Sequence, residues 1–124
     1  MSGFLGSGAG LFEIRCCAGN ESDLLVRNNT LGAELAKSLG EHSLVLMRGH
    51  GSMVVGTSLR QAVFRGVYAE VNARLQSDAM KLGGVTYLTA GEAAAAAAAN
   101  DGQIDRAWDM WWLLAKKRAS FAEV

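Results

Sequence analysis

A histidine between two glycines, Gly49-His50-Gly51, joins two apolar runs and limits the folds open to this chain. The runs cover residues 44–47 and 53–55, and Gly56 ends the second. Short apolar runs separated by a glycine-rich break are typical of two buried strands joined by a turn. Glycine permits a positive φ or a close backbone approach, and neutral imidazole is the commonest protein metal ligand. The pattern indicates a ligand site at His50, with a histidine satisfied by backbone hydrogen bonds in a tight turn as the alternative.

The patterns before this turn predict one strand and one helix. Residues 11–15 alternate apolar and polar side chains, as in a short strand with one buried face. Residues 19–23 have the composition of a turn. Leucines spaced four apart then predict a helix that begins near Asn29 or Thr30, either of which can cap it, and stops at Gly40.

The pattern after the turn predicts a long helix that begins at an N-cap residue, Thr57 or Ser58, and stops at Gly83-Gly84. Its apolar residues recur at three- and four-residue spacings, as expected of a face that packs on a core. They are Leu59, Val63, Phe64, Val67, Tyr68, Val71, Leu75 and Ala79. Glu70 lies close to this stripe, and we interpret it as a solvated helix residue, with a packing-network role as the alternative.

Two further helices are predicted toward the C-terminus. Residues 85–88 form a short strand or an extended connector, and Thr89 and Glu92 then match a capping box ahead of seven alanines. The last helix covers about residues 103–119. Its large apolar area indicates either intrachain core or a subunit interface, where aromatic anchors concentrate. That area comes mainly from Trp108, Trp111 and Trp112.

The stretch from Leu46 to Leu88 resembles part of the class II aldolase/adducin family. The shared pattern is an apolar strand, an Arg/Asn-x-His-Gly turn, a second strand, a glycine and a long helix with a Glu at the position of Glu70. The resemblance covers about residues 4–118. It implies a three-layer α/β/α domain with a mainly antiparallel sheet, here represented by its C-terminal half. In family enzymes the histidine of this turn is the third ligand of a catalytic divalent metal, usually zinc with Mn²⁺ or Co²⁺ as alternatives, which implies that role for His50.

The resemblance also places the other metal ligands, a His-x-His pair, upstream of the segment that corresponds to residues 2–6. A catalytic zinc centre uses about three protein ligands. The second histidine of this chain, His42, matches no ligand position. We therefore expect residues 1–124 to be a partial domain that binds the metal weakly or not at all, and whether Met1 is the true start stays open.

Within that partial domain we expect a glycine-rich loop over residues 1–10. Strands and helices around the His-Gly motif follow over residues 11–88, and C-terminal helices over residues 89–124. The loop lacks the Lys-Ser/Thr of a P-loop, and no apolar strand precedes it. We therefore predict no phosphate or dinucleotide site in the loop.

Charge and cysteine content exclude several classes of partner. The 12 basic and 12 acidic residues cancel, and no basic stripe alternates with aromatic residues, so we expect no nucleic-acid partner. No apolar run approaches the roughly 20 residues of a membrane span, and residues 1–10 do not resemble a signal peptide. Cys16 and Cys17 are adjacent and fit no zinc-site spacing, which predicts free thiols in a reducing compartment. These features predict a cytoplasmic protein that uses no membrane.

The resemblance predicts a metal-dependent lyase that cleaves a carbon–carbon bond, as an aldolase or as a decarboxylase of a hydroxy acid. The expected substrates are small hydroxy or keto acids or sugar phosphates. Residues 72–76 and the tryptophan-rich helix look more like family members that act on aromatic or dicarboxylic substrates. We expect a homo-oligomer, because family active sites form between subunits. The alternatives are a non-catalytic assembly module of the adducin kind and an inactive truncated homologue.

Overall fold

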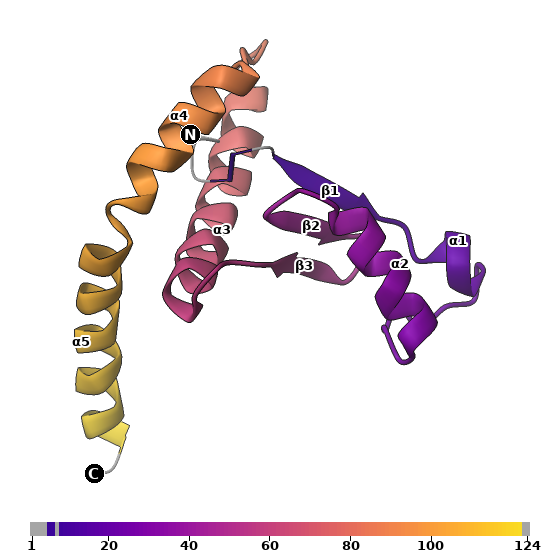
Figure 1. Cartoon of the computed structure of the whole chain (residues 1–124), viewed down its shortest axis with the longest axis horizontal. Helices are drawn as coiled ribbons and strands as arrows, with labels where there is room; N and C mark the ends of the chain where they lie inside the picture. Colours follow the sequence, from indigo (N-terminus) through magenta and orange to yellow (C-terminus); the bar gives the residue numbers. More distant parts are fainter. Residues whose placement is uncertain (1–4, 7, 123–124) are drawn as a thin grey trace.

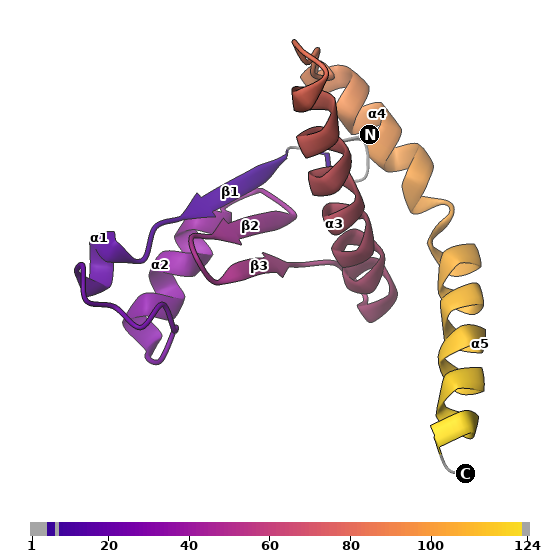
Figure 2. The same cartoon turned by 180° about the vertical axis from the view of Figure 1, so that it is seen from behind.

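The computed structural model describes residues 5–6 and 8–122, which form one small sheet and five helices (Figure 1). In chain order the elements are β1 (Ala9–Phe12), α1 (Arg15–Ala18), α2 (Asn29–Leu39), β2 (Leu44–Met47), β3 (Gly51–Val54), α3 (Leu59–Lys81), α4 (Ala90–Asp101) and α5 (Ile104–Ala122). The sheet with α1 and α2 lies on one side of the molecule, and α3, α4 and α5 lie on the other (Figures 1 and 2). None of these helices is long and apolar enough to cross a membrane, as far as the described residues extend.

The three strands form one mixed sheet in the order β1-β2-β3. β1 runs parallel to β2, with Phe12 opposite Met47, whereas β2 runs antiparallel to β3, with Met47 opposite Gly51. A parallel pair needs a crossover, which α1 and α2 provide, and an antiparallel pair needs only a tight turn. The expected α/β class is confirmed. The expectation of a mainly antiparallel sheet is not, because one of the two strand pairs in the described region is parallel.

Helix α2 packs against one face of the sheet and closes the main apolar core. Gly10 allows this close packing, because a Cβ there would lie 2.1 Å from the backbone oxygen of Ser38 on α2. Alternate residues of a strand point to opposite faces, so Val45 is fully buried beneath α2 while Leu46 points away and is 46% exposed. The core cluster consists of Phe12, Ile14, Leu31, Leu35 and Val45.

Helix α3 covers one end of the opposite face of the sheet. A Cβ at Gly66 would lie 3.6 Å from Cγ2 of Val54 on β3, and the Arg65 guanidinium donates to the carbonyl oxygen of Val55 at 2.8 Å. Leu11 lies farther along the same face and is 69% exposed. Within the described residues, the third layer of the expected three-layer arrangement is therefore only partial.

Strand β1 lies earlier in the chain than the alternation over residues 11–15 predicts. It ends at Phe12, and Arg15 begins the one-turn helix α1. The Glu13 carboxylate accepts a hydrogen bond from the backbone N–H of Arg15 at 3.1 Å and another from Nε of the same residue at 2.9 Å. These local bonds turn the chain, so an alternating pattern of the strand type ends in a helix.

Helix α2 begins at Asn29, as predicted, but its N-cap is the residue before the predicted caps. Its N-cap is Asn28, whose side-chain oxygen accepts from the backbone N–H of Leu31 at 2.9 Å. The predicted caps, Asn29 and Thr30, are already inside the helix. Ser58 caps α3 in the same manner, which confirms that prediction.

The capping box predicted for α4 is present. The backbone N–H of Thr89 donates to Oε2 of Glu92 at 2.8 Å, and the N–H of Glu92 donates to Oγ1 of Thr89 at 3.3 Å. The residues before it, 85–88, are an extended connector and carry no strand pairing in the described region. Local hydrogen bonds therefore set the start of α4 without help from the sheet.

The apolar stripe of α3 is less buried than its periodicity predicts. Phe64 is buried, but Leu59 and Val63 on the same helix are exposed. Phe64 contacts the ring of Tyr68 and that of Trp111 on α5, at centroid distances of 4.7 and 6.1 Å. α3 therefore buries one narrow face against α5 and the end of β3, and leaves much of its stripe in solvent.

Candidate functional site at the turn between β2 and β3

His50 lies in a three-residue turn between β2 and β3, where the sequence predicted it. Its backbone N–H donates to the carbonyl oxygen of Met47 at 3.0 Å, and its side chain is exposed. Both flanking glycines have a positive φ, 69° at Gly49 and 149° at Gly51, which residues with a Cβ rarely adopt. A Cβ at Gly49 would also lie 3.1 Å from Cδ1 of Leu24. The two glycines thus permit the turn that presents the imidazole to solvent.

Arg48 attaches this turn to the end of β1. Its backbone N–H donates to the carbonyl oxygen of Phe12 at 3.2 Å, which continues the β1–β2 pairing by one residue. Its Nε lies 3.0 Å from Oε1 and 2.8 Å from Oε2 of Glu13. Main-chain and side-chain contacts therefore hold the first residue of the turn, two residues before His50.

Glu13 is the anionic centre of this attachment. Arg15 donates to it through Nε at 2.9 Å and through a terminal nitrogen at 2.6 Å, in addition to the contact from Arg48. The hydrogen bond from the Arg15 side chain is the main cause that lowers the pKa of Glu13 from 4.5 to about 2. Partial burial opposes the shift, and the backbone N–H of Arg15 and the guanidinium of Arg48 add to it. The carboxylate is therefore ionised throughout the physiological range.

Glu13 carries no signal of this role in the sequence. Its partner Arg48 belongs to the turn motif, but the two residues are 35 positions apart. Ion pairs at three- and four-residue spacings on a helix can be read from the sequence. A pair formed through parallel strand register has no such local signal.

The second histidine lies away from the turn. His42 is half-buried just before β2, and His50 follows that strand. β2 is four residues long, so about 13 Å of extended chain separates its two ends. His42 and His50 therefore lie at opposite ends of β2, too far apart to bind one ion together.

A complete metal centre does not fit the residues that the structure describes. They contain no group of three or more His, Cys, Asp or Glu side chains that could hold an ion. His50 contributes one nitrogen ligand, whereas a catalytic zinc site uses about three protein ligands and an open position. A metal-bound reaction step cannot be built from these residues.

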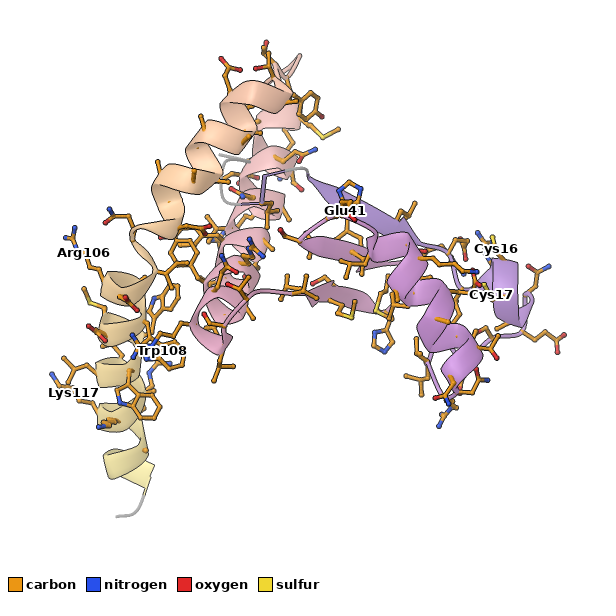
Figure 3. The ribbon with its side chains drawn as sticks, viewed as in Figure 1. Cys16, Cys17, Glu41, Arg106, Trp108 and Lys117 are labelled. Atoms are coloured by element: carbon orange, nitrogen blue, oxygen red, sulfur yellow. The ribbon has the colours of Figure 1, made fainter. Side chains whose placement is uncertain are left out.

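Two other predicted features lie outside this turn. Cys16 and Cys17 are free and exposed on α1, at the end of the molecule remote from α5 (Figure 3). Glu70 is exposed on α3, which favours the interpretation as a solvated helix residue. These side chains take no part in the contacts around His50 that the structure describes.

Comparison with known proteins gives the same family as the turn motif. The sequence model of the class II aldolase and adducin N-terminal domain matches residues 9–77, from β1 into α3. The chain belongs to the class II aldolase and adducin family.

The relatives found by sequence comparison include decarboxylases. The decarboxylase tropJ of Talaromyces stipitatus is 33% identical over 132 residues, a match that covers 90% of this chain and 50% of that protein. The 3,4-dihydroxyphthalate decarboxylases of a Terrabacter species and of Arthrobacter keyseri are each 36% identical over 61 residues. Each of these matches covers 49% of this chain; the matched segment is 26% of the length of the Terrabacter protein and 25% of that of the Arthrobacter protein. The chain thus spans about half the length of tropJ, and the matched segment spans about a quarter of the other two.

Proposed function

We propose that this chain is part of a lyase that removes carbon dioxide from a small hydroxy acid. The observation that carries the proposal is the similarity to relatives named as decarboxylases, over nearly the whole chain in the case of tropJ. The family match includes β1, the β2–β3 turn and most of α3. Decarboxylation is therefore favoured over aldol cleavage, the other reaction expected from the family.

The proposed substrate is an aromatic hydroxy acid. Two of the relatives are named for 3,4-dihydroxyphthalate, an aromatic ring that carries two hydroxyl and two carboxyl groups. Residues 72–76 and the tryptophan-rich helix pointed to aromatic or dicarboxylic substrates at the level of sequence. A sugar phosphate is the less favoured choice, because neither line of support includes one.

In this proposal His50 supplies one ligand of a divalent metal, Zn²⁺ in the first place and Mn²⁺ or Co²⁺ as alternatives. The remaining ligands come from residues that are not in the described part of this chain. Arg48 and Glu13 act as positioning residues, because their contact holds the start of the turn against β1. The exposure of His50 supports the proposal, since a ligand must be accessible to an ion.

An assay of carbon dioxide release from 3,4-dihydroxyphthalate tests the proposal. The coding DNA upstream of Met1 is first read for a His-x-His pair, and the protein it encodes is assayed with each metal. We expect release that is lost in His50→Ala and retained in His42→Ala, because the two histidines lie at opposite ends of β2. Release that is unaffected by His50→Ala, or equally reduced by His42→Ala, would contradict the role of His50. Absence of release from the metal-loaded protein would contradict the substrate.

The alternative of a non-catalytic assembly module receives no support from these relatives, whose names are those of enzymes. It would be favoured if the encoded protein lacked the upstream histidine pair. In that case we expect no metal and no carbon dioxide release.

A further inference from the structure

The second half of α3 and the connector that follows it border a cavity of about 380 Å³. The connector, residues 85–88, leads from α3 to α4 at one end of the molecule (Figures 1 and 2). The side-chain amide of Gln76 on α3 donates to the hydroxyl of Tyr87 on the connector at 3.4 Å. Ligand pockets usually have volumes of about 300–1,000 Å³, so one small molecule can fit here. We call this space the 72–88 cavity.

Asn72 lines this cavity with an amide that no described protein group satisfies. Both polar atoms of its side chain, Oδ1 and Nδ2, are shielded from solvent, and neither makes a hydrogen bond with the described residues. A buried donor or acceptor without a partner costs free energy, so most such groups in folded proteins are paired. Asn72 lies four residues after Tyr68 and three before Leu75, on the side of α3 that carries its apolar residues. Packing alone would favour an aliphatic side chain there, whereas recognition of a ligand would favour an amide.

The other side chains around the cavity are uncharged. Leu75, Val85 and Leu88 contribute aliphatic walls, and Tyr87 contributes an aromatic ring. No acidic or basic side chain is among the described residues that line the space. A charged ligand would lose its hydration here without gaining a counter-charge, so the cavity favours an uncharged ligand.

We propose that the 72–88 cavity binds an uncharged planar ring compound that carries a hydrogen-bond donor and an acceptor side by side. An aromatic primary amide has this pair of groups, and so does the N6–N7 edge of adenine, which asparagine recognises with two hydrogen bonds. The terminal torsion of an asparagine side chain is broad, so the amide of Asn72 turns into the cavity when the ligand enters. Its Nδ2 then donates to the acceptor of the ligand, and its Oδ1 accepts from the donor. The ring of the ligand lies against Tyr87 and the aliphatic walls.

This site is separate from the His50 turn. The turn precedes β3, and α3 follows that strand. From Leu59, the first residue of α3, the helix rises about 20 Å to Asn72 at 1.5 Å per residue. The proposal does not rest on the proposed function, because a hydroxy acid is an anion at neutral pH and the described walls of the cavity offer it no cation. A failed decarboxylase assay and a failed binding test would therefore be separate results.

Isothermal titration calorimetry of the complete chain with benzamide and with adenine tests the proposal. We expect at least one of them to bind with a Kd of about 1 mM or lower, which is within reach of a ligand of this size. Binding of benzamide alone would identify an aromatic amide as the ligand, and binding of adenine alone would identify a purine. The dimethylated forms of the two probes, N,N-dimethylbenzamide and N6,N6-dimethyladenine, lack the N–H donor and should bind at least about tenfold more weakly. Benzoate has the shape of benzamide but a negative charge, and should be weakened as much.

Asn72→Leu removes the amide and keeps a similar side-chain volume. This variant should bind the probe at least about tenfold more weakly, because both hydrogen bonds are lost. Its midpoint of thermal unfolding should be unchanged or higher, since the variant no longer buries an unpaired amide. The matched control is Asn20→Leu, which makes the same change at an exposed position in the turn before α2 and should leave binding unchanged.

Three results would overturn the proposal. The first is that neither probe binds the original chain, as expected if the amide holds only water. The second is that Asn72→Leu binds the probe as tightly as the original chain does. The third is that Asn72→Leu lowers the midpoint of thermal unfolding, which would mean that the amide already has a hydrogen-bond partner in the fold.

Discussion

Nε of Arg48 lies 2.8 Å from Oε2 of Glu13 and joins the start of the His50 turn to the residue that follows β1. The contact spans 35 positions in the sequence. It exists because β1 and β2 run parallel in register, so their last paired residues, Phe12 and Met47, lie side by side. The turn motif of the family is thus held by a strand that lies far upstream of it.

Replacement of Glu13 by Gln should lower the midpoint of thermal unfolding by a few degrees at pH 7, since exposed ion pairs contribute modestly. The pKa of Glu13 is lowered in the folded state, from 4.5 to about 2. Its stabilising contribution is therefore fully present above pH 4.5 and is lost as the pH falls toward 2.

Thermal unfolding of both proteins from pH 7 to pH 2 checks this prediction. The difference between original and variant should be constant down to about pH 5 and should shrink below it. Glu21→Gln is the control, because Glu21 is exposed and makes no ion pair with the described residues. If the difference between the two unfolding midpoints grew as the pH fell, the prediction for Glu13 would be wrong.

Val45 and Leu46 are neighbours on β2 that point to opposite faces of the sheet. Val45 is fully buried, so Val45→Ala should reduce the free energy of unfolding by about 2 kcal/mol through lost burial and a new cavity. Leu46→Ala removes a larger group but from a half-exposed position, and should cost less than about 1 kcal/mol. Urea unfolding measures both. Equal losses would mean that a further layer covers Leu46.

Gly10 lies beneath α2, where a Cβ would be 2.1 Å from the backbone oxygen of Ser38. Gly10→Ala must shift the helix or the strand, and we expect a loss of about 1–3 kcal/mol in the free energy of unfolding. Gly32→Ala on α2 is the matched control, because a Cβ there meets no atom within 4 Å and its φ is not positive. That change should be neutral or stabilising by up to about 1 kcal/mol. Urea unfolding of the two variants decides between these outcomes.

The chain by itself should retain little or no Zn²⁺, Mn²⁺ or Co²⁺ after dialysis against a mild chelator. The described residues offer His50 without a group of three ligands, and one ligand holds an ion weakly. Elemental analysis of the dialysed protein measures the retained metal. One equivalent of metal that His50→Ala removes would show that ligands outside the described residues complete the site.

Much of this architecture follows from local patterns in the sequence. The glycines beside His50 predicted the turn, because few other residues adopt its positive φ. Ser58 and the Thr89–Glu92 pair predicted the starts of α3 and α4, because a cap depends on side chains within three residues of the amide they satisfy.

The tertiary structure decided what depends on contacts between distant segments. The parallel pairing of β1 with β2 was not predicted, because strand direction is set by the crossover and not by the alternation of side chains. The contact of Glu13 with Arg48 follows from that register. The tryptophans show the same limit. Their spacing along α5 is visible in the sequence. Adjacent residues on a helix point about 100° apart, so Trp111 and Trp112 cannot both face α3. Only the packing of Trp111 against Phe64 shows which of the two does so, while Trp112 is 52% exposed.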